Sequence, residues 1–224
     1  MNFKLQLHSF YDLFVVDTAD ASGSNPDKIL TNTRKNFQEI IVDTGLTYMG
    51  KNHVARVVFY DTTLTPPNET YYFYQDPNGD LYRYNFGFNL LNQFTFLTQL
   101  IGSQVDVGWV LAAKMTSAEG TKWTARTDSV LIQAYNTEVY LVSQGQMLAD
   151  TVFLVGAESI KARHSRNVVT ASTAGGAETG NVVIDSYYST DAGEIVEDFY
   201  RHVTLAGQLL NQQAQGKLKI MTQK

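Results

Sequence analysis

The feature that most constrains this chain is a long succession of short stretches rich in β-branched and aromatic residues. Asn, Gly, Asp and Ser separate these stretches, and the 224 residues include only 4 prolines. Stretches of this kind, bounded by turn-forming residues, are typical of β-strands. An alternating segment at residues 2–8 predicts a first, half-buried strand. Ten further strands are predicted at Val54–Tyr60, Thr70–Gln75, Leu81–Phe88, Val105–Met115, Lys122–Arg126, Val130–Tyr135, Glu138–Ser143, Thr151–Ala157, Val168–Ser172 and Val182–Tyr188.

Three other segments have apolar residues at helical spacing. The first begins at Asn25-Pro26, which reads as an N-cap followed by proline at the first helical position, and ends near Gly45. The others cover residues 89–101 and 191–216. Without internal repeats or a linker, the best count is one domain, residues 1–224. The predicted fold class is mainly β (α+β): an antiparallel β-sandwich or barrel with two to three flanking helices.

Two further parts of the chain are predicted to reach outwards. Residues 159–181 have a glycine-rich centre at 174–180, which predicts a protruding β-hairpin arm with a flexible tip. The basic C-terminal tail, residues 216–224, alternates Lys217 and Lys219 with Leu218 and Ile220. Such a segment can add as a strand to a neighbouring subunit. Both segments are therefore candidates for contacts with partners.

The composition favours association with other subunits over a monomeric state. Charged residues make up 17% of the chain, against an average of about 25%, while aromatic residues reach 12%, with 13 Tyr and 12 Phe. Interspersed charge keeps domains monomeric, and Tyr and Phe are enriched in interface cores. The alternative is a compact β-domain that simply uses many tyrosines. The 44% hydrophobic fraction excludes wholesale disorder.

Several classes of chemistry lack their sequence signatures. With 0 cysteines there is no disulfide framework, thiolate metal site or thiol nucleophile. The 4 histidines have no metal-binding spacing, and the glycine-rich segment lacks the Lys-Ser/Thr of a phosphate loop. No cofactor and no metal are predicted. No stretch approaches the roughly 20 apolar residues of a membrane span, and the first ten residues do not predict a signal peptide. The expected partners therefore exclude a membrane.

The most specific local motif is a tyrosine-rich hairpin around Asp76-Pro77-Asn78-Gly79. With a three-residue loop, Tyr74 lies opposite Tyr82 and Tyr72 lies opposite Tyr84, so that all four tyrosines share one face. If Asn78-Gly79 alone forms the loop, the register shifts and the other aromatic residues of the two strands gather instead. The face is interpreted as a subunit interface or a platform on which sugars stack. The alternative is an ordinary sheet face packed on the 89–101 helix.

Charges in the second half of the chain fall into three blocks of alternating sign. Lys161, Arg163 and Arg166 form a basic block, six acidic residues between 178 and 198 form the next, and Lys217 and Lys219 belong to the last. Complementary patches of this kind suit head-to-tail contacts, which close into rings. The alternative is a solvated hairpin beside a helix with an acidic first turn. Three cations give only weak, salt-sensitive binding to DNA, so at most grazing contact with nucleic acid is expected.

In composition, and in the kinds of segment that it contains, the chain resembles virion structural proteins of tailed bacteriophages, in particular ring, adaptor and tail components. The resemblance rests on cysteine-free strands rich in Tyr, Asn, Thr and Gly, the low charge, the 159–181 hairpin and the basic tail. The resemblance implies a non-catalytic subunit that is repeated in a cyclic homo-oligomer and contacts other structural proteins. The implied location is a virion, with the cytoplasm as the alternative.

Three functions remain open from the sequence. The leading hypothesis is a structural subunit of a large symmetric assembly, with interface candidates Tyr72, Tyr74, Tyr82, Tyr84, Lys161, Arg163, Arg166, Lys217 and Lys219. The alternative is a β-sandwich carbohydrate-binding module that uses the tyrosine face. The third is an enzyme whose site is assembled from dispersed residues, because geometry rather than spacing defines such sites.

Overall fold

The structure is a computed structural model that describes residues 7–19, 28–61, 69–86, 106, 108–132, 136–155, 157–176, 178–190, 193–205 and 208–223. Side chains are described for residues 40–58, 70–86, 106, 108–131, 136–154, 157, 159–176 and 181–190. These residues contain twelve strands, namely β1 (Leu7–Ala19), β2 (Lys28–Tyr48), β3 (Lys51–Asp61), β4 (Glu69–Gln75), β5 (Asp80–Tyr84), β6 (Trp109–Lys114), β7 (Lys122–Ile132), β8 (Thr137–Val155), β9 (Glu158–Thr173), β10 (Glu178–Ser189), β11 (Gly193–Leu205) and β12 (Gln208–Gln223). None of the described segments forms a helix with the length and apolar composition of a membrane span.

The strands form one antiparallel sheet in the order β6-β5-β4-β3-β2-β1-β12-β11-β10-β9-β8-β7. The order is sequential in each half, and the halves join where β1 pairs with β12, for example Leu7 with Gln223. The prediction of a mainly β, antiparallel chain is confirmed.

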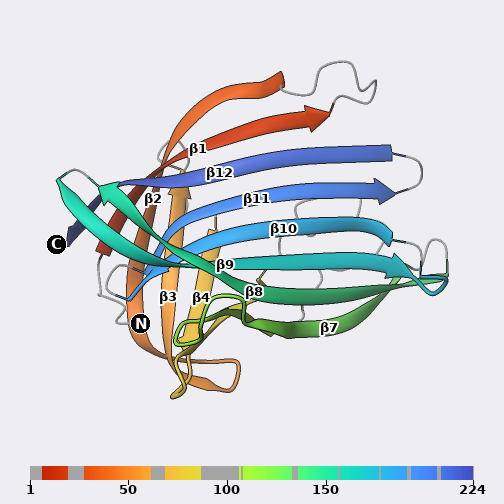
Figure 1. Ribbon diagram of the computed structural model, residues 1–224, viewed down its shortest axis with the longest axis horizontal. Coiled ribbons are helices and arrows are strands. Elements are labelled where there is room, and N and C mark those ends of the chain that lie inside the picture. Colours follow the sequence, from red (N-terminus) through yellow and green to blue (C-terminus); the bar gives the residue numbers. More distant parts are fainter. Residues whose placement is uncertain are drawn as a thin grey trace.

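The connection between β6 and β7 forces this sheet to curve. The two strands lie at opposite ends of the sheet order, and in a flat sheet of twelve strands those ends would be about 50 Å apart. The chain from Lys114 to Lys122 spans under about 30 Å even when fully extended. The sheet must therefore bend until its ends approach each other. In Figure 1, β8 to β12 run across the view, and β3 and β4 run steeply behind them.

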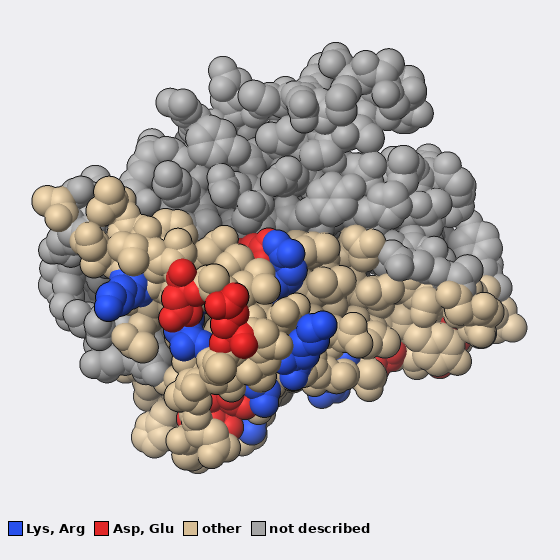
Figure 2. Space-filling model, viewed as in Figure 1, with Lys and Arg blue, Asp and Glu red and all other residues tan. Residues whose placement is uncertain are grey.

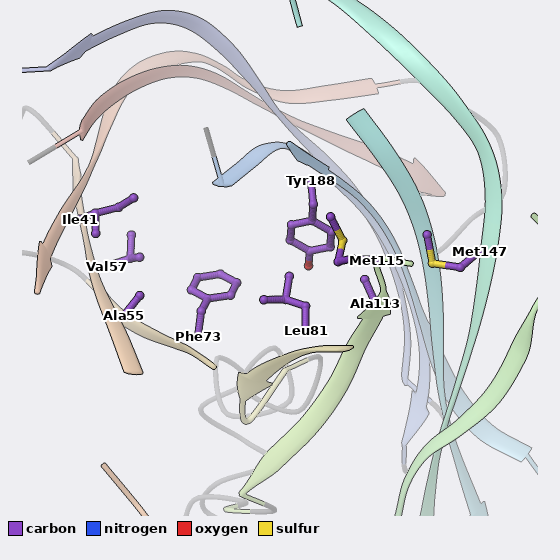
Figure 3. Packing of buried hydrophobic residues seen from close by; sticks show 9 residues of the cluster. All are labelled: Ile41, Ala55, Val57, Phe73, Leu81, Ala113, Met115, Met147 and Tyr188. Atoms are coloured by element: carbon purple, nitrogen blue, oxygen red, sulfur yellow. The ribbon is translucent and has the colours of Figure 1, made fainter. Parts of the chain in front are cut away.

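The hydrophobic core lies between the two parts of the curved sheet. Phe73 on β4 and Leu81 on β5 approach Tyr188 on β10 and Met147 on β8, and all four are fully buried (Figure 3). A second cluster joins Phe86, Val110, Ala112, Leu141, Val169, Val182 and Ile184. Burial of such side chains contributes about 1.5–3 kcal/mol each. Residues far apart in sequence therefore hold the two parts together.

Strand β6 ends the sheet order, yet its carbonyl groups have hydrogen-bond partners from across the core. The Ala112 carbonyl accepts hydrogen bonds from Ser165 Oγ at 2.6 Å and Asn167 Nδ2 at 2.8 Å, and both of these side chains are fully buried. The Leu111 carbonyl accepts a bond from Trp123 Nε1 at 3.0 Å. We call these three side-chain contacts the β6 seam. These contacts replace some of the backbone hydrogen bonds that a neighbouring strand would make on this edge of β6. They also pair buried carbonyl groups, which would cost free energy if they were left without a donor.

Trp123 reaches the β6 seam because a glycine lies beneath its indole ring. An added Cβ at Gly145 on β8 would lie 2.1 Å from Trp123 Cε2 and 2.2 Å from its Cζ2. No side chain fits at that distance, since carbon atoms in contact are about 3.5–4.0 Å apart. The position therefore requires glycine on steric grounds.

Two of the three predicted helices are wrong. Residues 28–48 form strand β2, and the 191–216 segment contains β11 and most of β12. Both segments carry β-branched and aromatic residues, which lose side-chain freedom in a helix. Pairing of β2 with β1 and β3, and of β11 with β10 and β12, overrides the helical spacing. The predicted 89–101 helix lies outside the described residues.

The two segments that were predicted to reach outwards are paired within the chain. Strands β9 and β10 do form a hairpin, but β9 also pairs with β8 and β10 with β11. The 159–181 segment is thus an inner part of the sheet and not a protruding arm. The tail residue Lys217 on β12 pairs with Asp12 on one side and Val196 on the other. Both edges of β12 are therefore paired as far as Lys217, whereas the described pairings beyond it, to Gln223, are with β1 alone.

Candidate binding face

The turn at residues 76–80 sets the register of the tyrosine hairpin. Gly79 N donates to the Asp76 carbonyl at 3.0 Å, and the positive φ of 88° at Gly79 closes the three-residue loop. Asp76 Oδ1 also accepts bonds from Asn78 N and Asp80 N, both at 2.9 Å. These bonds place Tyr74 opposite Tyr82, as the three-residue loop predicts, and that register is confirmed.

The tyrosines lie on the side of the sheet that faces away from the core. Phe73, Leu81 and Arg83 alternate with them along β4 and β5 and are buried, at 2%, 0% and 2% exposure. The tyrosines themselves are half-buried. Six rings from β2, β4, β5 and β6 gather on this side, and we call them the aromatic face: Tyr48, Tyr72, Tyr74, Tyr82, Tyr84 and Trp109.

The rings of the aromatic face are in contact with one another. Tyr48 stacks on Tyr72 with centroids 3.9 Å apart and an angle of 9° between the planes. Trp109 makes edge contacts with Tyr84 at 5.4 Å and Tyr74 at 6.1 Å, and Tyr74 lies 6.0 Å from Tyr82. Such pairs contribute about 0.5–1.5 kcal/mol each beyond the area that they bury. The face is therefore a connected surface with a defined ring geometry.

A two-residue turn brings a cation onto this face. Met49 and Gly50 join β2 to β3 with φ of 43° and 75°, the left-handed values of a tight hairpin turn. Trp109 Nε1 donates to the Met49 carbonyl at 3.0 Å and so fixes the turn to the face. Lys51 follows the turn, and its Nζ lies 4.9 Å from the centroid of the Tyr74 ring and 5.9 Å from that of Tyr82. Cation–π attraction stabilises this position.

Three phenol groups of the face, those of Tyr48, Tyr82 and Tyr84, remain protonated well above neutral pH. Burial raises the pKa of Tyr84 to about 12, with a contribution from its hydrogen bond to Asp106 Oδ2 at 3.1 Å. Burial is also the main reason that the pKa values of Tyr48 and Tyr82 are raised. At pH 7 these hydroxyls are hydrogen-bond donors and carry no charge. The face thus combines apolar rings with polar groups.

One acid of the predicted acidic block, Asp185, pairs with the predicted basic block within the chain. Arg166 Nε and Nη2 donate to Asp185 at 2.9 and 2.8 Å, and His164 Nε2 lies 3.0 Å from Asp185 Oδ1. Arg163 Nε lies 3.1 Å from Asp150 Oδ1, and its guanidinium also donates to the Ser117 carbonyl. Figure 2 shows Lys and Arg atoms next to Asp and Glu atoms on the described part of the visible face.

Asp185 is held in its ionised form by this ionic cluster. Burial opposes ionisation, yet hydrogen bonds from His164 and Arg166 outweigh burial and lower the pKa of Asp185. Asp185→Asn is expected to lower the free energy of unfolding by about 1–2 kcal/mol at pH 7, because a charged hydrogen-bond acceptor is lost from a partly exposed site. The folded-state pKa lies below the unfolded value of about 3.9, so the stabilisation is present above that pH and is lost as the pH falls through the folded-state pKa. Urea unfolding at pH 7 and pH 3 measures this.

A matched control for this prediction is Asp150→Asn, since the Asp150 side chain is 57% exposed. Its ion pair with Arg163 is expected to contribute less than about 0.5 kcal/mol. If the Asp185→Asn difference were equal at both pH values, the ionised carboxylate would not be its cause.

The other predicted site residues are less informative. Lys161 is exposed on β9. Lys217 and Lys219 lie on β12, whose side chains are not described. Among the described residues, no three His, Asp or Glu side chains are grouped to hold a metal ion.

Two rings of the aromatic face, Tyr48 and Trp109, were missed in the sequence, as was the cation that lies over it, Lys51. They lie on other strands than the tyrosine hairpin, and only long-range pairing brings them to it. Trp109 reaches it because β6 pairs with β5, where Tyr84 lies opposite Trp109. No local pattern signals this arrangement.

Comparisons with known proteins bear on the fold alone. No family model matches the chain, and no curated protein matches it. The chain is similar to a solved structure titled a "putative lipoprotein" from Parabacteroides distasonis ATCC 8503, with a TM-score of 0.50 over 98% of this chain and 96% of that chain. The two sequences are 9% identical. The class that these observations define is an antiparallel curved-sheet protein with an aromatic outer face.

Proposed function

We propose that this chain is a non-catalytic carbohydrate-binding module of the β-sandwich type, and that the aromatic face is its binding surface. The observation that carries the proposal is the position of six connected rings on the side of the sheet opposite the core. The rings are half-buried, and the apolar area that they still present to water costs about 25 cal/mol per Å². Large apolar surface patches on soluble domains mark interaction sites. A bound ligand recovers that free energy.

The chemistry of the face fits a sugar. One side of a pyranose ring presents C–H groups, which carry partial positive charge and pack on the negative face of an aromatic ring. The hydroxyls around the sugar need donors and acceptors at the same place. The protonated Tyr48 and Tyr82 hydroxyls, each of which can donate and accept, supply both. The aromatic face therefore offers stacking and hydrogen bonding together.

A subunit of a symmetric assembly, such as a viral particle, is the second candidate. It is favoured by exposed apolar side chains outside the aromatic face, notably Val152 at 55% and Leu154 at 76% exposure near the end of β8, and Leu131 at 50%. Features that suggested this function in the sequence have partners within the chain: the 159–181 hairpin is an inner part of the sheet, the tail pairs with β1 as far as Gln223, and Arg166 pairs with Asp185. Analytical ultracentrifugation separates the two candidates, because an assembly subunit sediments as an oligomer without any sugar.

The enzyme hypothesis has less support. His164 and Asp185 form a hydrogen bond, but Arg166 shares the carboxylate and the Tyr187 ring stacks on the imidazole with centroids 4.2 Å apart. This arrangement is that of a stabilising ionic cluster.

A glycan array followed by calorimetric titration tests the carbohydrate proposal. The wild-type protein is expected to bind at least one class of oligosaccharide, and Tyr74→Ala to weaken that binding about 10-fold, since one stacking contact contributes about 1.4 kcal/mol. Tyr140→Ala is the matched control, because Tyr140 is a 40% exposed tyrosine on β8 outside the face. Absence of binding to every glycan, or equal binding by Tyr74→Ala, would contradict the proposal.

A further inference from the structure

The acidic and basic groups around the aromatic face differ in whether they have partners within the protein. Each nearby carboxylate already has donors: Asp106 accepts from Tyr84 and from Gly108 N, and Asp80 lies 3.8 Å from Lys114 Nζ. Asp76 accepts the backbone bonds of its own turn. These acids are therefore occupied by the protein itself.

The cations of the face are not engaged in this way. Within the described part of the chain, no carboxylate forms an ion pair with Lys51 or with Arg56. Lys51 Nζ is instead placed over the rings of Tyr74 and Tyr82. Arg56 on β3 is exposed and pairs in register with Tyr72 on β4. An ammonium group over a ring retains donors for an incoming anion.

From this juxtaposition we propose that the aromatic face selects acidic saccharides, with Lys51 as the specificity-determining residue and Arg56 as a second contact. The sugar ring stacks on the face while its carboxylate or sulfate group accepts hydrogen bonds from the Lys51 ammonium. Charge-assisted hydrogen bonds of this kind are about twice as strong as neutral ones. The inference rests on the carbohydrate-binding function proposed above and names its ligand class.

The position of Lys51 explains why this cation is the selective one. The Met49–Gly50 turn sets where Lys51 begins, and the bond from Trp109 Nε1 to the Met49 carbonyl fixes that turn. A cation held in place loses less freedom on binding than one on a mobile side chain. The chain as a whole carries a net charge of −5, so an acidic ligand must be attracted locally rather than by the overall field.

The test uses pairs of probes that differ in charge alone: oligomers of galacturonic, glucuronic and mannuronic acid, each with its methyl ester. Calorimetric titration with the wild-type protein is expected to give at least 10-fold tighter binding of one acidic oligomer than of its ester. Lys51→Gln is expected to remove that preference, so that the affinities of the variant for the acidic oligomer and for its ester lie within about 2-fold of each other. Lys161→Gln, an exposed lysine on another part of the sheet, is the matched control and is expected to retain the preference.

Three results would overturn this inference. One is equal binding of acid and ester by the wild-type protein. Another is a preference that Lys51→Gln leaves unchanged. The third is binding of poly-glutamate or of a free uronic acid that is as tight as binding of the acidic oligomer and that Tyr74→Ala does not weaken. That result would mean that Lys51 binds anions in general. Neutral oligosaccharides that still require Tyr74 would leave the carbohydrate function standing, whereas no saccharide binding of any kind would remove both.

Discussion

Replacing Gly145 with alanine is expected to lower the free energy of unfolding by about 3 kcal/mol and the melting temperature by about 6–12 °C. The new methyl group would lie 2.1 Å from Trp123 Cε2, so the indole has to move. Its hydrogen bond to the Leu111 carbonyl is then lost, which opens one contact of the β6 seam. Differential scanning calorimetry measures the shift.

The matched control is Gly175→Ala, because a Cβ at Gly175 meets no atom within 4 Å. That variant is expected to change the melting temperature by less than about 2 °C. A double-mutant cycle with Trp123→Leu identifies the cause: if the clash with the indole destabilises Gly145→Ala, the alanine should cost much less when residue 123 is leucine. An unchanged cost in the cycle would mean that the backbone at Gly145, and not the indole, sets the requirement.

Trp109→Ala is expected to weaken binding of any saccharide found on the array about 30-fold or more. The indole contacts Tyr48, Tyr74 and Tyr84, and its Nε1 fixes the turn before Lys51. Removing it therefore disorders several rings and the cation together, and aromatic anchors of this kind contribute 2 kcal/mol or more to binding, by the usual measure of about 1.4 kcal/mol for each tenfold. Titration calorimetry gives the affinity, and near-ultraviolet circular dichroism should show reduced aromatic signal.

Trp109→Phe provides the comparison that separates stacking from turn fixation. Phenylalanine retains a ring beside the tyrosines but has no N–H group for the Met49 carbonyl. Its affinity is expected to fall between those of the wild-type protein and Trp109→Ala. Wild-type affinity in Trp109→Ala, measured on protein that retains its far-ultraviolet spectrum, would show that the aromatic face is not the binding surface.

Local patterns predicted the hairpin well and the long-range arrangement poorly. The residues Asp76 to Gly79 fix their own turn through short-range hydrogen bonds, so the position of Tyr74 opposite Tyr82 follows from sequence alone. Tyr48, in contrast, lies far from Tyr72 in the sequence. The two rings stack only because β2 pairs with β3 and β3 pairs with β4. Sequence patterns carry no information of this kind.

The helix errors have the same origin. In the 28–48 segment, apolar residues at Phe37, Ile40 and Ile41 satisfy helical spacing, and Gly45 resembles a helix end. Pairing on both edges of β2 decides the outcome instead, since each ladder supplies backbone hydrogen bonds that a helix would otherwise make. Strand pairing also decides the partner of Arg166: Asp185 lies 19 residues further along the sequence, but β9 and β10 place the two residues opposite each other.

The pairing of β1 with β12 has a consequence for synthesis on the ribosome. Strand β1 ends at Ala19 and its partner on that edge, β12, begins at Gln208, so β1 is synthesised roughly 190 residues ahead of that partner. At about 5–20 residues per second, β1 waits roughly 10–40 s with one edge open. An open edge is a template for pairing with other chains. Nascent molecules of this protein therefore pass through an interval in which a chaperone that shields β1 would raise the yield of folded product.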